Sequence, residues 1–279
     1  MFLKFAYFDT KTFFLQFHEN FYTIQIKILQ NNLQCIENDF LKQMNICIIG
    51  STGAIGNAFL KHYSADKKVT NIYSFSRSKL EIDKASSIKN FQIDIENEDS
   101  IKKASEEVRG VAFDIVIVAT GILYTDEFGP EKSIRDLSFN KFEKIFKANT
   151  VGPAIIGKYF LPLLNKSSIS KMCFLSAKVG SISDNRLGGW YSYRASKTAL
   201  NQIIKNFSIE ISRSNKQAII VGLQPGTVSS KLSEPFTKPG QSNLFTPEES
   251  VRHLVSVIDE LEIDNNGCML SWDGSIIQP

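Results

Sequence analysis

Short apolar runs that alternate with helical segments constrain the fold of this chain more than any other feature. The run at residues 113–121 is apolar apart from Asp114 and Thr120, as a parallel strand covered on both faces requires. Strands that alternate with helices predict an α/β fold, a single doubly wound Rossmann-type domain with about seven parallel strands and helices on both faces. The predicted strands are residues 45–49, 69–76, 91–95, 113–121, 171–176, 217–223 and 268–272.

The chain is long enough for one such domain, because 43% of its 279 residues are hydrophobic. We assign the NAD(P)-binding Rossmann domain to residues 44–279, where the apolar runs lie. Residues 1–43 differ in composition, since eight of the 21 phenylalanines fall there among Asn, Gln and Lys. We expect them to form an N-terminal extension that is not part of the core domain.

This extension carries no targeting signal that we recognise. It has no apolar run long enough for a signal peptide or a membrane span, and it is not poor in acidic residues as an organellar presequence would be. We therefore expect a cytoplasmic protein without a membrane partner.

Charge and metal-ligating residues argue against other classes. The net charge is +3, from 32 basic and 29 acidic residues, which gives no strong field for capturing nucleic acid. The four cysteines form no Cys-x-x-Cys pair, and the three histidines do not stand at metal-ligand spacing. We expect no nucleic-acid partner, no disulfide framework and no metal.

A glycine-rich turn stands between the first predicted strand and a helical segment at residues 57–63. Glycines allow positive φ and close backbone approach, and free amides at a helix start attract a pyrophosphate. Glycine spacing alone is weak evidence, but its place between a strand and a helix strengthens it. The predicted pyrophosphate site consists of Gly50, Ser51, Thr52, Gly53, Ala54, Ile55 and Gly56.

Arg77 ends the second predicted strand, where an acidic residue would hold the adenosine ribose of NAD. An arginine flanked by hydroxyls suits a 2′-phosphate instead, which favours NADP (NADPH) over NAD. A solvated arginine at a strand end is the alternative interpretation.

The third and fourth predicted strands end in residues that suit the rest of a dinucleotide. Asp94, followed by Ile95, can accept a hydrogen bond from the adenine amino group. Ala119, Thr120 and Gly121 are small and leave room for a cofactor at the end of a buried strand.

Tyr193 and Lys197 stand four residues apart in a predicted helix, so both side chains leave the same face. A nearby ammonium stabilises phenolate, which makes Tyr193 a candidate general acid or base with a lowered pKa. Such a pair also arises by chance in helices. Tyr191 is a rival phenol, but it lies on another face and is assigned to the pocket wall or the core.

Three further segments reach the carboxyl edge of the predicted sheet, where ligands bind in open parallel sheets. Asn149 lies inside a long helical stretch at residues 138–164 and is either a satisfied core residue or a site residue. Ser176 ends the fifth strand. The sixth strand is closed by Pro225, Gly226, Thr227 and Val228, and residues 230–245 after it suggest a mobile lid over a substrate.

These ordered motifs resemble the short-chain dehydrogenase/reductase (SDR) family, and within it the branch of C-factor-like proteins and small carbonyl reductases. The resemblance covers residues 44–279 and rests on the glycine turn, Asp94, Ala119-Thr120-Gly121, Asn149, the Tyr193/Lys197 pair and residues 225–228. The branch is indicated by residues 179–185, by Gly-Gly-Trp-Tyr before the Tyr193 helix and by Trp272-Asp273-Gly274.

The resemblance implies roles for these residues. Tyr193 would donate a proton to a carbonyl that receives hydride from the nicotinamide, and Lys197 would bind the nicotinamide ribose and keep Tyr193 acidic. Asn149 would hold a water that connects Lys197 to solvent, and the Thr227 region would contact the carboxamide. The family also implies a homodimer or homotetramer, often through the helices that carry Asn149 and Tyr193.

The chain departs from the family pattern at three places. Ala54 fills the place of the family's second glycine, and Thr120 stands in the Asn-Ala-Gly marker. Ala177 occupies the position of the serine that polarises the carbonyl. Either Ser176 turns inward, Ser181 substitutes, or the site works without this hydroxyl.

We therefore expect an NADPH-dependent oxidoreductase that reduces a small aldehyde or ketone, with a carbonyl or alcohol as its small-molecule partner. The alternative is an NADP-binding sensor or signalling protein with little catalysis, because Ala177 replaces the expected serine and the second glycine is displaced from its usual place, which Ala54 fills. A sugar epimerase or dehydratase of the extended type is disfavoured, since too little chain follows Gly226 for a larger substrate domain.

Overall fold

The computed structural model describes residues 44–78, 87–237 and 244–279. They form a seven-stranded sheet in the order β3-β2-β1-β4-β5-β6-β9, in which every neighbouring pair is parallel. The predicted doubly wound α/β fold is confirmed. The strands are β1 Met44–Ile49, β2 Val69–Ser76, β3 Ile88–Gln92, β4 Ile115–Val118, β5 Ser170–Leu175, β6 Ala218–Gln224 and β9 Met269–Ser271. The extension expected at residues 1–43 lies outside the described residues.

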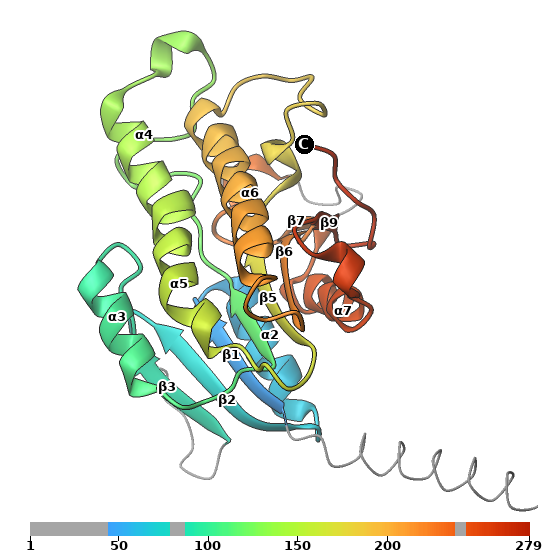
Figure 1. Ribbon diagram of the computed structural model, residues 1–279. Helices are drawn as coiled ribbons and strands as arrows, with labels where there is room; N and C mark the ends of the chain where they lie inside the picture. Colours follow the sequence, from blue (N-terminus) through green and yellow to red (C-terminus); the bar gives the residue numbers. More distant parts are fainter. Residues whose placement is uncertain (1–43, 79–86, 238–243) are drawn as a thin grey trace, which may run out of the picture. The chain divides into compact units, whose positions relative to one another are not determined.

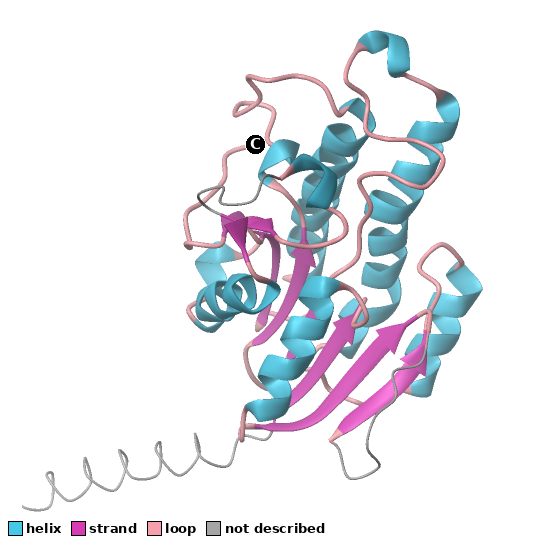
Figure 2. Cartoon of the chain, turned by 180° about the vertical axis from the view of Figure 1, so that it is seen from behind, coloured by secondary structure: helices cyan, strands magenta, loops and turns pink. Residues whose placement is uncertain are grey.

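Helices cover both faces of the sheet, as Figures 1 and 2 show from opposite sides. On one face, α3, α5 and α6 pack over a core that includes Phe75, Phe113, Phe160 and Phe174. On the other, α2 and α7 pack over a second core. The helices are α2 Ala54–Ala65, α3 Glu98–Glu107, α4 Phe139–Phe146, α5 Gly152–Phe160, α6 Tyr191–Ile211 and α7 Pro247–Asp259.

The apolar strands explain why the sheet is buried on both faces. All four residues of β4 are buried, and its neighbours β1 and β5 contribute only buried residues over their last four positions. Each large side chain removed from water contributes roughly 1.5–3 kcal/mol. The sheet therefore fixes the position of the loops at its carboxyl edge.

Some elements differ from the sequence prediction. The third strand was expected at residues 91–95, but β3 ends at Gln92, and Asp94 Oδ1 accepts from Glu96 N–H in a turn at 3.0 Å. The helical stretch expected at 138–164 is divided into α4, a π-helical turn Lys147–Val151, α5 and a 3₁₀ turn Leu161–Leu163. A small parallel pair was not predicted, β7 Thr227–Val228 with β8 Leu244–Phe245.

Two searches of the described residues bear on function. None of their helices combines the length and the apolar character that crossing a bilayer requires. In the same ranges, His, Cys, Asp and Glu side chains do not gather in groups of three that could hold a metal ion.

Candidate active site

The glycine turn after β1 is shaped by two close backbone approaches. Gly50 has φ +90°, and a Cβ there would lie 2.6 Å from the carbonyl oxygen of Ala119. A Cβ on Gly56 would lie 2.1 Å from the carbonyl oxygen of Gly50. Gly53 precedes α2 as its N-cap, and no side chain caps the helix. The free amides at the start of α2 are therefore open to an anion.

The other members of this turn have different roles. The Ser51 hydroxyl is buried, donating to Phe75 O at 3.2 Å and accepting from Ser74 Oγ at 2.8 Å, so it ties the turn to β2. Thr52 and Ala54 are exposed, and Ile55 packs against the core under α2 and α7.

A groove of about 550 Å³ runs along the carboxyl edge of the sheet from Arg77 to Gly121. It is also lined by Ile122, Tyr124 and Lys144. Thr120 Oγ1 is buried there without a hydrogen-bond partner in the described chain. Glycine backbone, open amides and an unpartnered buried hydroxyl fit a dinucleotide. Among the predicted cofactor residues, the groove brings together Gly50, Thr52, Gly53, Arg77, Asp94, Ile95, Ala119, Thr120 and Gly121.

Lys197 and Tyr193 project from successive turns of α6. The Lys197 Nζ donates to Leu175 O at 2.9 Å and lies 5.9 Å from the centroid of the Tyr193 ring. Burial lowers the pKa of Lys197 to about 8 and raises the pKa of Tyr193 to about 12. The sequence predicts that the ammonium lowers the pKa of Tyr193, but burial of the phenol raises it instead.

Gly121 connects this pair to the groove. A Cβ on Gly121 would lie 3.2 Å from Lys197 Nζ and 3.3 Å from Asn149 Oδ1. Lys197 and Asn149 thus flank the end of the groove that Gly121 lines. A larger residue at this position would meet both side chains.

Asn149 lies in the π-helical turn, a local irregularity that is frequent at functional sites. Its Oδ1 accepts from Ile122 N–H at 2.8 Å, and its Nδ2 donates to Ile122 O at 2.8 Å and to Ser196 Oγ at 3.1 Å. The amide therefore fastens the loop after β4 to α6. The water relay expected for Asn149 stays a prediction.

The two candidate serines are engaged elsewhere. The Ser176 hydroxyl is 4% exposed and donates to Asn201 Oδ1 at 2.6 Å. The Ser181 hydroxyl accepts from Asp184 N–H at 3.2 Å and lies 3.3 Å from Ser183 Oγ. Ala177 follows Ser176 in extended conformation. The role of either hydroxyl at the site stays a prediction.

The segment after β6 is fixed by its own contacts and does not line the groove. Pro225 O accepts from Ser250 Oγ at 2.7 Å, and Gly226 has φ +78° with the Phe245 ring 2.7 Å from its Cβ position. Thr227 and Val228 form β7.

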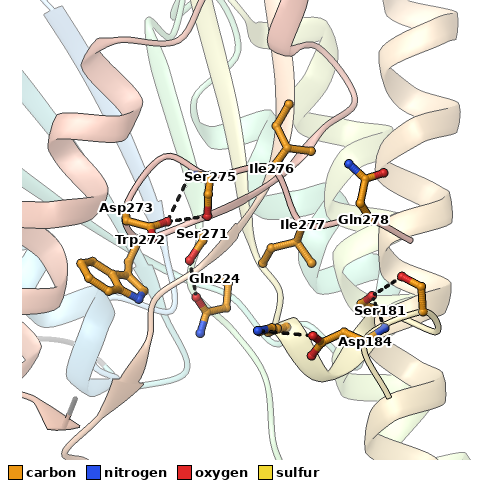
Figure 3. Close-up of a pocket in the computed structure, with 12 residues that line it drawn as sticks. Ser181, Asp184, Gln224, Ser271, Trp272, Asp273, Ser275, Ile276, Ile277 and Gln278 are labelled. Atoms are coloured by element: carbon orange, nitrogen blue, oxygen red, sulfur yellow. Dashed lines mark hydrogen bonds and ion pairs between the residues drawn. The ribbon is translucent and has the colours of Figure 1, made fainter. Parts of the chain in front are cut away.

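A second pocket, of about 510 Å³, lies beyond the carboxyl ends of β6 and β9. Figure 3 shows Gln224 and Ser271 between Trp272 and Asp273 on one side and Ser181 and Asp184 on the other. Ser271 Oγ donates to Gln224 Oε1 at 3.1 Å, and an ion pair of 3.4 Å joins Lys178 to Asp184. Of this pocket, the sequence analysis named Ser181, Ser183 and Asp184, within residues 179–185, and the Trp272-Asp273-Gly274 segment.

Sequence reasoning named Trp190 only as part of the Gly-Gly-Trp-Tyr marker, and it gave no role to Phe236 or Glu131, which also lie around Tyr193. The Trp190 ring lies edge-on to Tyr193, with 6.1 Å between centroids, and Phe236 is 5.2 Å from Trp190. Glu131 is 1% exposed and accepts from Ser192 N–H at the start of α6. The left-handed backbone of Trp190 has no sequence signal except the two preceding glycines.

The chain is similar in sequence to a known family and to individual proteins. The profile of a family described as short chain dehydrogenase matches residues 44–240. The 1-hydroxy-2-glutathionyl-2-methyl-3-butene dehydrogenase of Rhodococcus sp. (strain AD45) is 30% identical over 188 residues, 67% of this chain and 78% of that protein. The C-signal protein of Myxococcus xanthus is 27% identical over 143 residues, 51% and 81% of the two chains.

Among solved structures, the fold is similar to that of NADPH-bound carbonyl reductase from chicken fatty liver. The TM-score is 0.73 at 22% sequence identity, over 86% of this chain and 100% of the reductase.

Proposed function

The chain belongs to the short chain dehydrogenase family, and from that membership we propose that it is an NADPH-dependent reductase of small aldehydes and ketones. The observation that carries the proposal is the convergence of Lys197 and Asn149 on Gly121, at the end of a groove that fits a dinucleotide. Tyr193 lies one helical turn from Lys197 on α6. We assign the activity to residues 44–279.

The proposed roles follow from burial and charge. Bound NADPH would supply a hydride to the carbonyl carbon. Tyr193 gives its phenolic proton to the carbonyl oxygen, so that an alcohol is formed. Burial raises the pKa of Tyr193 to about 12, so the phenol carries its proton at neutral pH and has it available to give to the carbonyl oxygen. Lys197, anchored on Leu175 O, holds a positive charge beside the groove.

One observation favours a second candidate function. Ser176 donates to Asn201, and Ala177 carries no hydroxyl, so Tyr193 is left to polarise the carbonyl alone. Loss of one such donor costs on the order of 10² to 10³ in rate. An NADP-binding sensor or signalling protein with little catalysis would have this arrangement. Tight NADPH binding by calorimetry, with no turnover of any carbonyl, would favour that function.

The reductase proposal is tested by Tyr193→Phe. Wild-type protein with NADPH and a panel of aldehydes and ketones is expected to lose the absorbance of the reduced nicotinamide. Because the mutation removes only the proton donor, the rate should fall by about 10²-fold or more while NADPH binding persists. Tyr191→Phe, which removes the neighbouring phenol on another helix face, is the matched control. Equal turnover by Tyr193→Phe and wild type would exclude the mechanism.

We also propose that Arg77 pairs with the 2′-phosphate of the cofactor, so that the protein binds NADP more tightly than NAD. Arg77 is exposed at the end of β2 and lines both the groove and an adjoining pocket that contains Lys103. In Arg77→Asp, the KM for NADPH should rise about tenfold or more, since hydrogen bonds to charged groups are strong, while the KM for NADH stays within twofold. Arg109→Asp, at the exposed end of α3, controls for net charge. A parallel rise for both cofactors would contradict the assignment.

A further inference from the structure

We propose that Trp190, Phe236 and Tyr124 form an aromatic wall that selects carbonyl compounds carrying a flat apolar group, such as aryl aldehydes and aryl ketones. Glu131 is the positioning residue that holds this wall beside Tyr193. The inference rests on the proposed function and names the substrate class of the same site.

The wall is built from three separate segments of the chain. Trp190 precedes α6, Phe236 lies in a 3₁₀ turn Glu234–Phe236, and Tyr124 follows β4. Trp190 and Phe236 meet edge to face with centroids 5.2 Å apart, and Phe236 and Tyr124 meet likewise at 5.9 Å. Each ring is half-buried, so part of each is accessible.

The wall reaches both the proton donor and the cofactor groove. At one end, the Trp190 ring lies edge-on to Tyr193, with centroids 6.1 Å apart. At the other end, Tyr124 lines the groove. The Tyr124 hydroxyl donates to Lys231 O, which ties the segment after β7 to the loop after β4. The three rings therefore form a continuous series of contacts from Tyr193 to the groove.

The Trp190 ring is held by a strained turn. Gly188, Gly189 and Trp190 have φ of 62°, 65° and 50°, three successive residues in the left-handed region. Within the described ranges, Trp190 is the only residue other than glycine with positive φ. A bulky residue in this conformation costs free energy and persists only where its surroundings over-determine it. Such strain is found at functional sites, where it pre-organises a side chain.

Glu131 and Arg194 supply the contacts that hold the turn. Trp190 N–H donates to Glu131 O at 2.5 Å, and Ser192 N–H donates to Glu131 Oε2 at 3.3 Å. Arg194 Nε donates to Gly189 O at 3.2 Å. The carboxylate of Glu131 thus sits at the N-terminus of α6, where the helix dipole favours negative charge.

The Glu131 side chain is buried, although burying a charged group raises the free energy of the fold. The residue is 1% exposed, and its Oε1 has no hydrogen-bond partner among the described residues. A buried carboxylate with an unpaired oxygen destabilises a fold unless it is held by other contacts. Glu131 lies between the left-handed turn and the first turn of α6. From this position it can hold Trp190 in place.

Ring faces and edges recognise flat apolar groups. Offset or edge-to-face contacts between aromatic rings stabilise a pair beyond the area that they bury. Arg194, the cation beside the left-handed turn, donates to the carbonyl oxygens of Gly189 and Val179. An aryl group is therefore a better match to this wall than a charged or polyhydroxylated one.

Trp190→Asn tests the wall. Asparagine tolerates the left-handed conformation but has no ring, so the turn is kept and the aromatic face is lost. The kcat/KM ratio of benzaldehyde to butanal should exceed one in the wild type and fall about tenfold in the variant, mainly through the KM for benzaldehyde. Trp190→Phe should restore part of the ratio. Leu187→Ala, at an exposed position of the same loop, should leave it unchanged. An unchanged ratio in Trp190→Asn overturns the wall.

Two variants of Glu131 test the positioning role. Glu131→Gln keeps an oxygen that can accept from Ser192 N–H and should keep the benzaldehyde to butanal ratio. Glu131→Ala removes that acceptor and should lower the ratio toward the value of Trp190→Asn. A folded Glu131→Ala protein, judged by its circular dichroism, that loses activity equally on both aldehydes would show a purely structural role and overturn this part.

A binding measurement separates this inference from the proposed function. Trp190 and Trp272 are the two tryptophans of the chain, so in Trp272→Phe the indole fluorescence comes from Trp190 alone. Benzaldehyde should quench it at concentrations where butanal does not, with or without turnover. Quenching without NADPH oxidation would refute the reductase and keep the wall, whereas turnover without selective quenching would refute the wall and keep the reductase.

Discussion

Burial moves the pKa values of Tyr193 and Lys197 in opposite directions, and each change has a chemical consequence. The phenol, with its pKa raised to about 12, stays protonated, while the ammonium, lowered to about 8, lies close to the physiological range. Spacing of four residues predicts that the two side chains share a helix face, but it does not predict their distance from solvent. Likewise, the place of Ser51 in the glycine turn does not predict that its hydroxyl is buried and accepts a hydrogen bond from Ser74.

The lowered pKa of Lys197 predicts a pH-dependent effect on stability. A lysine whose folded pKa is below the unfolded value near 10.5 destabilises the fold fully below pH 8, and the penalty disappears as pH rises above 10.5. The wild type should therefore gain stability relative to Lys197→Met between pH 7 and pH 10, by about 2 kcal/mol. Denaturant unfolding of both proteins at the two pH values measures this difference. If the difference in unfolding free energy between the two proteins is the same at both pH values, the pKa of Lys197 is not lowered by folding.

The helix and strand motifs could be predicted to within a few residues, but their irregular parts could not. Apolar periodicity identified the stretch 138–164 as helical, yet the π turn at Lys147–Val151 depends on tertiary contacts. That turn aims Asn149 at Ile122. Gly152, which follows the turn as the first residue of α5, approaches Ile95 O, which lies 2.7 Å from its Cβ position. Strand β3 ends early because Asp94 forms a local turn, which competes with the sheet.

The glycine turn offers a sharp test at the level of the element. Alanine in the middle of a helix is ordinarily more stable than glycine by about 1 kcal/mol. In Gly56→Ala, however, the new methyl would lie 2.1 Å from Gly50 O, so we expect a loss of about 3 kcal/mol and of NADPH binding. Gly53→Ala is the control, since its methyl would lie 3.4 Å from Gly50 O, an ordinary contact. Thermal unfolding and NADPH titration measure both, and equal stability of the two variants would refute the close approach.

At the scale of the whole molecule, the sequence predicted the architecture because the central strands are mostly apolar. Seven parallel strands with helices on both faces follow from that pattern and from short connections, and the branch resemblance was confirmed by the C-signal relative. The β7–β8 pair could not be predicted, since two-residue strands carry no periodicity. The aromatic wall could not be predicted either, because its three rings come from segments distant in sequence.

Exposed apolar side chains on and before α4 support the expected homodimer or homotetramer. Phe139, the first residue of α4, is 97% exposed, and Ile134 and Leu137 shortly before it are also exposed. Large apolar groups gathered at a surface mark an interaction site, and burying them against a second copy would remove this area from water. We expect light scattering at micromolar concentration to give the mass of a dimer or tetramer, and Phe139→Glu to lower it, because a charge would be desolvated in the interface. Ile263→Glu, at an exposed position in the turn Ile263–Asn265, should leave the mass unchanged. A monomeric wild type, or a Phe139→Glu protein of unchanged mass, would show that the α4 face is not an interface between copies of this chain.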